Sequence, residues 1–298
     1  MQHLRLAAAA AALLAVCAGG PVHAQTFTSV EGEARTFHLG AFELSAIRDN
    51  ALKYKTATVF GRDTDPAEVA KVLAAHGAST DGIALDVDAL VVRTPGHVAL
   101  LDTGLGVRFH GVLIASLAKA GVSPDQITDV FLTHSHLDHV GGLLDGHGHS
   151  AFPNAAIRMS ANEWAYMRSQ GGAKAMAAAI APQVKTFEPG QPVIPGITPI
   201  ASYGHTPGHV VYEVSSGDQT LVDIGDTAHS VVVSLAKPDW PNAFDGDKPT
   251  AARARRAELA HLADEHLLIF APHFPFPGVG RVERAGDGFV FKPEVPAK

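Results

Sequence analysis

The chain has 298 residues, of which 46% are hydrophobic and 18% charged, so a globular core is expected and extensive disorder is excluded. Its formal net charge of -7 offers little attraction to a nucleic-acid backbone, and no nucleic-acid partner is expected. Arg253, Arg255 and Arg256 are clustered in a predicted helix, where we expect them to form a solvated face.

The first 24 residues have the pattern of an export signal. Arg5 precedes a run of Ala, Leu and Val over residues 6–16, and Val22-His23-Ala24 has small residues where a signal peptidase cleaves. The run is shorter than the roughly 20 apolar residues of a membrane span, so no stable membrane insertion is expected. We therefore predict cleavage near Ala24, a periplasmic or secreted protein, and a single mature domain over residues 25–298.

Cys17 is the only cysteine of the chain, and it lies inside this predicted signal. A lipoprotein site at Cys17 is the alternative interpretation, which the size of Val16 disfavours. Cleavage near Ala24 would leave a protein without thiols, and this excludes disulfides, thiolate nucleophiles and cysteine-bound zinc. Any metal would then be held by histidine and carboxylate, and the 17 histidines of the chain are many for its length.

Strands and helices alternate along the rest of the chain. The clearest helix begins with Asp65 as N-cap and Pro66 at the first helical position, and it ends near Ala75, before Gly77. A second is capped by Ser160, with Glu163 placed for a capping box. In chain order, the predicted elements are strands at 36–40, 42–47, 89–93 and 97–102, a helix at 107–120, a strand at 127–133, a helix at 160–180 interrupted at 171–172, a loop at 187–200, a hairpin at 210–214 and 220–224, a helix at 250–263 and a strand at 267–270.

Residues able to bind metal follow several of these strands, as is common for sites built at strand ends. The densest group is the run 133–139, Thr-His-Ser-His-Leu-Asp-His, which places three imidazoles and a carboxylate within six residues. Imidazole and carboxylate are good ligands for zinc and similar ions. His134 and His136 can serve one ion, and Asp138 and His139 a second, so further ligands must come from later in the chain.

The run 133–139 resembles the H-x-H-x-D-H signature of the metallo-β-lactamase superfamily. Four other motifs of that family have counterparts in the same order, namely Leu100–Gly104, Gly204–His209, Ile224–Thr227 and His273 after the strand at 267–270. The resemblance spans about residues 85–280. It implies an α/β protein with the αββα sandwich of the metallo-β-lactamase fold.

The resemblance also implies a binuclear metal site. It places His134, His136 and His205 on one metal and Asp138, His139 and His273 on the other, with Asp226 bridging the two ions. Asp102 would accept a hydrogen bond from a ligand imidazole, and His209 would support the site rather than bind metal. Zinc is the expected metal, with manganese, iron or cobalt as alternatives.

A narrower resemblance is to the methyl parathion hydrolase-like branch of the superfamily. It is carried by Lys237–Trp240, Phe244–Lys248, Thr250–Arg256 and His273–Gly280, the last similar to that branch's H-x-x-F-P-G-x-G ending. It implies a hydrolase of ester-like small molecules, namely lactones, aryl esters or organophosphate triesters, and it allows a homodimer. Together with the predicted export signal, this gives an exported hydrolase.

The expected reaction is attack by a metal-bridging hydroxide, with Asp138 and Asp226 holding the ions and orienting the water proton. His229 stands where lactonases of the superfamily have a tyrosine that assists the leaving oxygen. It is a candidate proton donor, with a loop histidine of no catalytic role as the alternative. Phe274 and Phe276 are candidates for an apolar pocket wall, whereas His147 and His149 are expected in an exposed loop.

Three alternative functions remain to be weighed. β-Lactam hydrolysis uses the same fold, but β-lactamases of this fold lack an aspartate at the position of Asp226. Hydrolysis of a cytosolic thioester is disfavoured by the predicted export. A periplasmic metal-binding protein without catalysis is the alternative from another class, and the apparently complete set of ligands for two metals argues against it.

Overall fold

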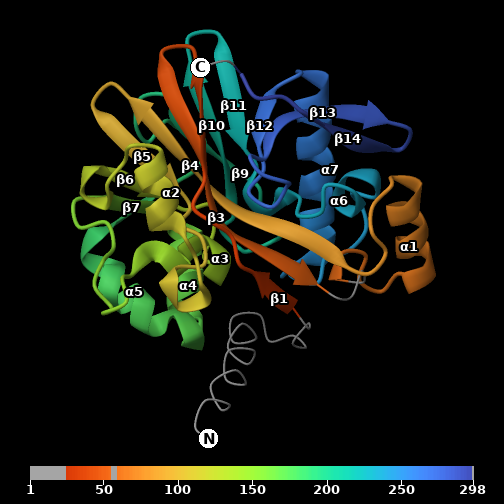
Figure 1. The fold of residues 1–298 in the computed structure, drawn as a ribbon, viewed down its shortest axis with the longest axis horizontal. Coiled ribbons are helices and arrows are strands. Elements are labelled where there is room, and N and C mark those ends of the chain that lie inside the picture. Colours follow the sequence, from red (N-terminus) through yellow and green to blue (C-terminus); the bar gives the residue numbers. More distant parts are fainter. Residues whose placement is uncertain (1–24, 55–58, 297–298) are drawn as a thin grey trace, which may run out of the picture.

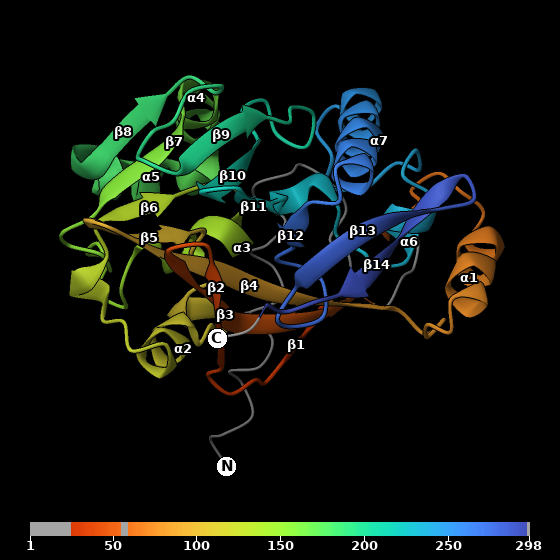
Figure 2. The same cartoon turned by 90° about the horizontal axis from the view of Figure 1, so that it is seen from above.

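We analysed a computed structural model, which describes residues 25–54 and 59–296. The predicted export signal, with Cys17, lies outside the described residues. The described chain forms two sheets that pack face to face, with helices on both outer sides (Figures 1 and 2). This is an αββα sandwich, and the predicted fold class is confirmed.

The first sheet contains the strands of the N-terminal half. Its strand order is β1-β3-β4-β5-β6-β7-β8, and β2 pairs with β3 off this path. The strands are β1 (Gln25–Thr28), β2 (Ala34–Leu39), β3 (Phe42–Tyr54), β4 (Ile83–Thr94), β5 (His97–Leu101), β6 (Asp129–Phe131), β7 (Ala156–Ser160) and β8 (Val184–Phe187). Strands β5 to β8 are parallel, so the loop after β6 lies at the carboxyl edge of this part of the sheet.

The second sheet contains the C-terminal strands in the order β14-β13-β12-β11-β10-β9. They are β9 (Ile197–Ala201), β10 (Val210–Ser216), β11 (Gln219–Asp223), β12 (Leu268–Phe270), β13 (Val279–Ala285) and β14 (Gly288–Pro293). Strands β11 and β12 pair in parallel, and the chain therefore leaves both of them at the same edge of the sheet.

Helices cover the outer faces of both sheets. They are α1 (Pro66–Ala75), α2 (Leu113–Lys119), α3 (Leu137–Val140), α4 (Ala161–Ser169), α5 (Lys174–Ile180), α6 (Val233–Ala236) and α7 (Lys248–Asp264). Apolar side chains of α2, α4 and α5 pack on the first sheet, and those of α7 pack on the second. None of the helices in the described part of the chain is long and apolar enough to cross a membrane.

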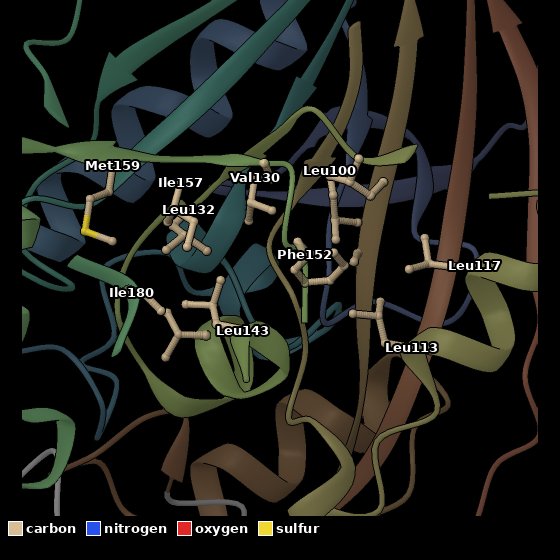
Figure 3. Packing of buried hydrophobic residues seen from close by; sticks show 14 of the residues in the cluster. Leu100, Leu113, Leu117, Val130, Leu132, Leu143, Phe152, Ile157, Met159 and Ile180 are labelled. Atoms are coloured by element: carbon tan, nitrogen blue, oxygen red, sulfur yellow. The ribbon is translucent and has the colours of Figure 1, made fainter. Parts of the chain in front are cut away.

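Buried apolar side chains fill the three spaces between these layers. Between the sheets, residues from β2 to β6 meet residues from β9 to β13. Outside the first sheet, Leu100 and Val130 of the strands belong to one packed cluster with side chains of α2, Leu143 and Phe152 (Figure 3). Burial of these side chains holds the strand ends in fixed positions relative to each other.

Phe152 provides a direct test of this packing, because its ring is fully buried among aliphatic side chains. We expect Phe152→Ala to lower the free energy of unfolding by about 3–5 kcal/mol, since the ring leaves a cavity. Chemical denaturation of the metal-free protein measures this change. A loss below about 1 kcal/mol would contradict the packing described here.

The predicted elements and the structure differ in several places. The helix predicted at 107–120 is a single 3-10 turn over Val107–Phe109 followed by α2, because His110 adopts a left-handed backbone conformation with φ of 64°. The helix predicted at 160–180 is interrupted near Gly171-Gly172, as expected. Strands β7, β8, β13 and β14 were not predicted, and the loop predicted at 187–200 is wrong at its end, because β9 begins at Ile197.

Candidate metal centre

The predicted ligands lie at one edge of the sandwich, where strands from both sheets end. The run 134–139 follows β6 and continues into α3, which lies near the centre of the view in Figure 2. His205 lies in the loop between β9 and β10, Asp226 follows β11, and His273 follows β12. The parallel arrangement of β11 and β12 brings the last two together.

Two groups of side chains could each hold a metal ion, with all their ligand atoms within 4.8 Å of one another. His134, His136, His205 and Asp226 form the first group. Asp138, His139 and His273 form the second group. Both groups are the ones that the superfamily resemblance implied, and the structure brings all seven side chains to one place.

His229 belongs to a third such group, with Asp226 and His273. Its ring lies 5.2 Å from that of His205 and stacks at 5.3 Å on that of His273. His229 is 3% exposed, so it is a buried part of the cluster rather than a residue of an exposed loop.

Unpaired nitrogen lone pairs show that these side chains fit metal ions. His139 and His273 each have their Nδ1 beside an acceptor, and their Nε2 atoms face each other at 3.3 Å. Two neutral imidazoles placed in this way repel unless a cation or a proton lies between them. In addition, His134 Nε2 and Asp226 Oδ1 are buried and have no hydrogen-bond partner among the described residues. Such orphaned atoms are expected where a metal binds.

Asp102 and Thr133 orient two of the imidazoles. His139 Nδ1 donates to Asp102 Oδ2 at 2.8 Å, and Asp102 also accepts from the Thr133 backbone N–H and hydroxyl. Because the Thr133 hydroxyl donates to Asp102, its oxygen accepts from His134 Nδ1 at 3.0 Å. Both imidazoles thus direct Nε2 lone pairs into the cluster, as ligand histidines require. Asp102 occupies the supporting position that the sequence analysis gave it.

His205 is oriented by a buried ion pair that the sequence analysis missed. His205 Nδ1 donates to Asp245 Oδ1 at 3.0 Å, and Arg255 donates to Asp245 Oδ2 at 2.7 Å. Arg255 also donates to the carbonyl of Thr227, just after Asp226. The prediction that Arg255 lies on a solvated helix face is wrong, because the side chain is 2% exposed and Asp245 compensates its charge.

Glu163 joins the two loops that carry the first group of ligands. Its carboxylate accepts from Ser135 N and Oγ at 2.8 and 2.5 Å, and from Thr206 Oγ1 and Gly208 N at 2.6 and 3.1 Å. The predicted capping box is half correct, because Ser160 Oγ does accept from Glu163 N. The Glu163 side chain, however, is fully buried and serves the ligand loops. Only the tertiary structure reveals this role.

His209 holds the backbone of Asp226, the residue expected to bridge the two ions. Its Nδ1 donates to the Ser202 carbonyl at 2.9 Å, and its Nε2 accepts from the Asp226 backbone N–H at 3.0 Å. Both ring nitrogens are therefore engaged within the protein. The structure places His209 outside the three groups that could hold a metal.

An aromatic wall lies beside His229. It consists of Tyr54, Phe60 and Phe244, with the rings of Phe60 and Phe244 5.5 and 6.0 Å from that of His229. The predicted wall residue Phe274 is instead fully buried in the core beneath α7, where its ring contacts Phe291. Phe244 belongs to one of the stretches that carry the branch resemblance, but none of the three rings was predicted to line the site.

Three other candidate residues do not form part of the metal-binding groups. Phe276 is half-buried beneath the guanidinium group of Arg48, which lies 5.5 Å from its ring. His147 and His149 are exposed, with ring centroids 6.5 Å apart, and they belong to none of the three groups.

Proton affinities in the cluster reflect its mixed charges. Burial raises the pKa of Asp226, but the imidazoles around it, His229 first, hold that pKa well below its usual range. Burial lowers the pKa of His205, because it disfavours the charged imidazolium, but Asp226 and Asp245 raise this pKa to about 9. In contrast, burial and the neighbouring His205 lower the pKa of His136 to about 3. Near neutral pH the metal-free cluster therefore stores at least one proton on its imidazoles.

Metal binding should release that proton, because metal ligands must be unprotonated. At pH 7.5 we expect release of at least one proton per chain, decreasing as the pH rises above about 9, the pKa of His205. Calorimetric titration in buffers of different ionisation enthalpy measures this number. The same proton stabilises the metal-free fold below about pH 6.5, and this contribution is lost as the pH rises through about 9. Metal uptake without proton release at pH 7.5 would contradict the assignment.

Comparison with known proteins identifies the family. Residues 82–273 match the Metallo-beta-lactamase superfamily, and this segment contains all the candidate ligands. The chain belongs to the metallo-β-lactamase superfamily. Together, the family and the ligand set make it a metallo-hydrolase.

Two solved structures resemble this metallo-hydrolase over most of its length. The dizinc quorum-quenching lactonase AidC, solved with the product N-hexanoyl-L-homoserine, has a TM-score of 0.84 and 29% identity, covering 90% of this chain and 99% of its own. Hydrolase AbOPH of the beta lactamase superfamily has a TM-score of 0.81 and 28% identity, covering 91% and 99%.

The curated relatives match over a smaller part of the chain. An N-acyl homoserine lactonase of Bacillus sp. is 29% identical over 170 residues, which are 54% of this chain and 61% of that protein. The chain spans 50% of Metallo-beta-lactamase domain-containing protein 1 of Xenopus laevis, to which it is 29% identical over 123 residues.

Proposed function

We propose that this metallo-hydrolase is a binuclear enzyme that opens lactones, the cyclic members of the ester-like class expected from its sequence. The observation that carries the proposal is the convergence of seven ligand-type side chains beside a buried imidazole and an aromatic wall. Two of their atoms, His134 Nε2 and Asp226 Oδ1, are buried without a hydrogen-bond partner among the described residues. The likeness to AidC, a dizinc lactonase, supports the choice of lactones.

Zinc is the metal that we propose for both positions, because imidazole and carboxylate ligands suit it. Two bound divalent ions would supply Lewis-acid activation of both the ester carbonyl and the attacking water. We propose that His134, His136 and His205 hold one ion, that Asp138, His139 and His273 hold the other, and that Asp226 contacts both.

The side chains around the ions would have distinct tasks. Asp138 is 22% exposed, whereas Asp226 is 3% exposed, so Asp138 faces the side from which substrate enters. We propose that both carboxylates orient the attacking water by accepting its proton in a hydrogen bond. His229 would contact the leaving oxygen of the ester and stabilise the charge that develops there.

The aromatic wall favours a neutral substrate. Tyr54, Phe60 and Phe244 present apolar rings on the His229 side of the cluster, and such rings bind an acyl chain or an aromatic group better than a charged one. A lactone with an apolar substituent fits this description. Organophosphate triesters are the second candidate, supported by the His273–Gly280 motif of the methyl parathion hydrolase-like branch.

A substrate panel tests the proposal. The zinc-loaded protein would be assayed with γ-lactones, p-nitrophenyl esters, a paraoxon-type triester and a chromogenic cephalosporin, each with and without a chelator. We expect the highest kcat/KM with lactones and loss of turnover with the chelator. Preferential cephalosporin hydrolysis would overturn the proposal in favour of a β-lactamase. No turnover by protein that binds two metals would favour a metal-binding protein.

Export and assembly are separate proposals. We propose that the chain is exported and cleaved near Ala24, since the first 24 residues have the composition of a signal. The intact mass of the protein recovered from the periplasm or medium tests this directly. A homodimer is proposed from the branch resemblance, and light scattering tests it.

A further inference from the structure

We propose that Asn242 fixes the tautomer of His229, so that this imidazole presents an N–H group rather than a lone pair to the metal pocket. Asn242 is thus a positioning residue that makes His229 a hydrogen-bond donor and keeps it from acting as an additional ligand. The question arises because Asp226, His229 and His273 have the spacing of a metal site of their own.

The orientation of the Asn242 amide is set by the backbone. Phe244 N donates to Asn242 Oδ1 at 3.0 Å, and a backbone N–H can only donate. The amide oxygen must therefore face Phe244, which leaves the NH2 group facing His229. Asn242 is 3% exposed, and its backbone forms an isolated antiparallel bridge with Phe60. Burial and this bridge restrict the position of the side chain.

The amide in turn determines which nitrogen of His229 carries the proton. Asn242 Nδ2 lies 2.9 Å from His229 Nδ1, and an NH2 group can only donate. Nδ1 must accept, so a neutral ring carries its proton on Nε2. On the other side of the ring, Nε2 lies 2.9 Å from Asp226 Oδ2, and a carboxylate accepts that proton. This contact is compatible with the same tautomer but does not by itself decide it, because Asp226 oxygens also lie 2.9–3.1 Å from Nε2 of His139, His205 and His273. The Asn242 amide is therefore the group that distinguishes His229.

The neighbouring ligand histidines have the opposite arrangement. The Nδ1 atoms of His139, His205 and His273 lie beside acceptors, namely Asp102 Oδ2 at 2.8 Å, Asp245 Oδ1 at 3.0 Å and the Asp86 carbonyl at 2.8 Å. When metal binds, these rings would keep a proton on Nδ1 and offer Nε2 lone pairs. His229 alone among these four rings has a donor beside Nδ1. Replacing that donor by an acceptor would make His229 equivalent to the ligands.

The consequence for catalysis rests on the proposed function. An N–H group that points into the pocket can donate to the leaving oxygen of an ester as negative charge develops there. A lone pair at the same place would bind a metal instead and remove the donor. Asn242 would thus keep His229 as a hydrogen-bond donor, whereas the ligand histidines offer lone pairs to the metal ions.

The test is to read the tautomer in the metal-free protein, without any assay of activity. Long-range 1H–15N spectra of histidine-labelled protein distinguish protonated from unprotonated ring nitrogens, and His229→Gln identifies the His229 signals. We expect a protonated Nε2 and an unprotonated Nδ1 in the natural chain. A proton on Nδ1 there would overturn the inference, and this measurement needs no variant of Asn242.

Asn242→Asp provides the second arm. A carboxylate beside Nδ1 should move the proton to Nδ1 and free Nε2, so the absorption spectrum of the cobalt-loaded protein should change as a nitrogen ligand is added. The control is Asn154→Asp, which adds the same charge at an exposed site where the amide only contacts the Asp125 carbonyl. An unchanged spectrum in folded Asn242→Asp would overturn the exclusion of His229 from the ligands.

Kinetics separate this inference from the proposed function. If lactones are substrates, Asn242→Asp should lower kcat by roughly 10–100-fold with a smaller change in KM, as for other residues that orient groups of a metal site. If the natural protein hydrolyses no lactone, the proposed function fails, whereas the tautomer and the cobalt spectrum still decide the role of Asn242.

Discussion

Replacing Asp226 by Asn is expected to abolish hydrolysis and to reduce metal binding from two ions per chain to at most one. Asp226 carries the negative charge at the centre of the cluster. Its oxygens lie 2.9–3.4 Å from the Nε2 atoms of His134, His139, His205, His229 and His273. Asn keeps the shape of the side chain but removes the charge that would contact both ions. The loss corresponds to several kcal/mol of transition-state stabilisation, on the order of 1,000-fold or more in kcat/KM.

The measurement is elemental analysis of zinc after dialysis, combined with kcat/KM for the best substrate. His209→Gln is a useful comparison, because His209 touches the Asp226 backbone and belongs to none of the metal-binding groups. It should retain two ions and lose less activity than the Asp226 variant. Two tightly bound ions and near-normal turnover in Asp226→Asn would refute the binuclear site.

Replacing Glu163 by Ala is expected to have the largest effect on stability of any change near the site. The fully buried carboxylate receives four hydrogen bonds, from Ser135, Thr206 and Gly208. Removing it leaves these buried donors without acceptors, at about 1–3 kcal/mol for each unsatisfied group. We expect the free energy of unfolding of the metal-free protein to fall by about 3 kcal/mol or more, measured by chemical denaturation.

A matched variant distinguishes loss of the charge from loss of the side chain. Glu163→Gln preserves the volume and one acceptor, but its NH2 group must face donors of either Ser135 or of Thr206 and Gly208. It should therefore destabilise the fold, but less than Glu163→Ala. Metal affinity should fall in both variants, because Glu163 holds the loops that carry His134, His136 and His205. Unchanged stability in Glu163→Ala would contradict the role given to this residue.

The order of motifs along the chain was enough to predict the fold class and the set of candidate ligands. Local signals also predicted α1, since Asp65 accepts from Ala67 N and Pro66 begins the helix. The helix predicted at 107–120 was too long, because the left-handed conformation of His110 depends on its surroundings. The roles of Arg255 and Glu163 were misread for a similar reason. Arg255 was predicted on a solvated helix face, and Glu163 was predicted to cap its own helix. Each side chain is instead buried against a loop 28 residues away in the chain.

The sequence by itself determined which chemical groups are present at the ends of the apolar strands, namely imidazoles and carboxylates. The single cysteine, Cys17, is not among them. Only the tertiary structure decided which nitrogen of each imidazole faces the pocket. For several of the rings that choice depends on distant partners, such as Asn242, which is 13 residues from His229, and the Asp86 carbonyl, which is 187 residues from His273. A ring nitrogen donates or accepts according to the atom beside it, and that atom is known only when the chain is folded.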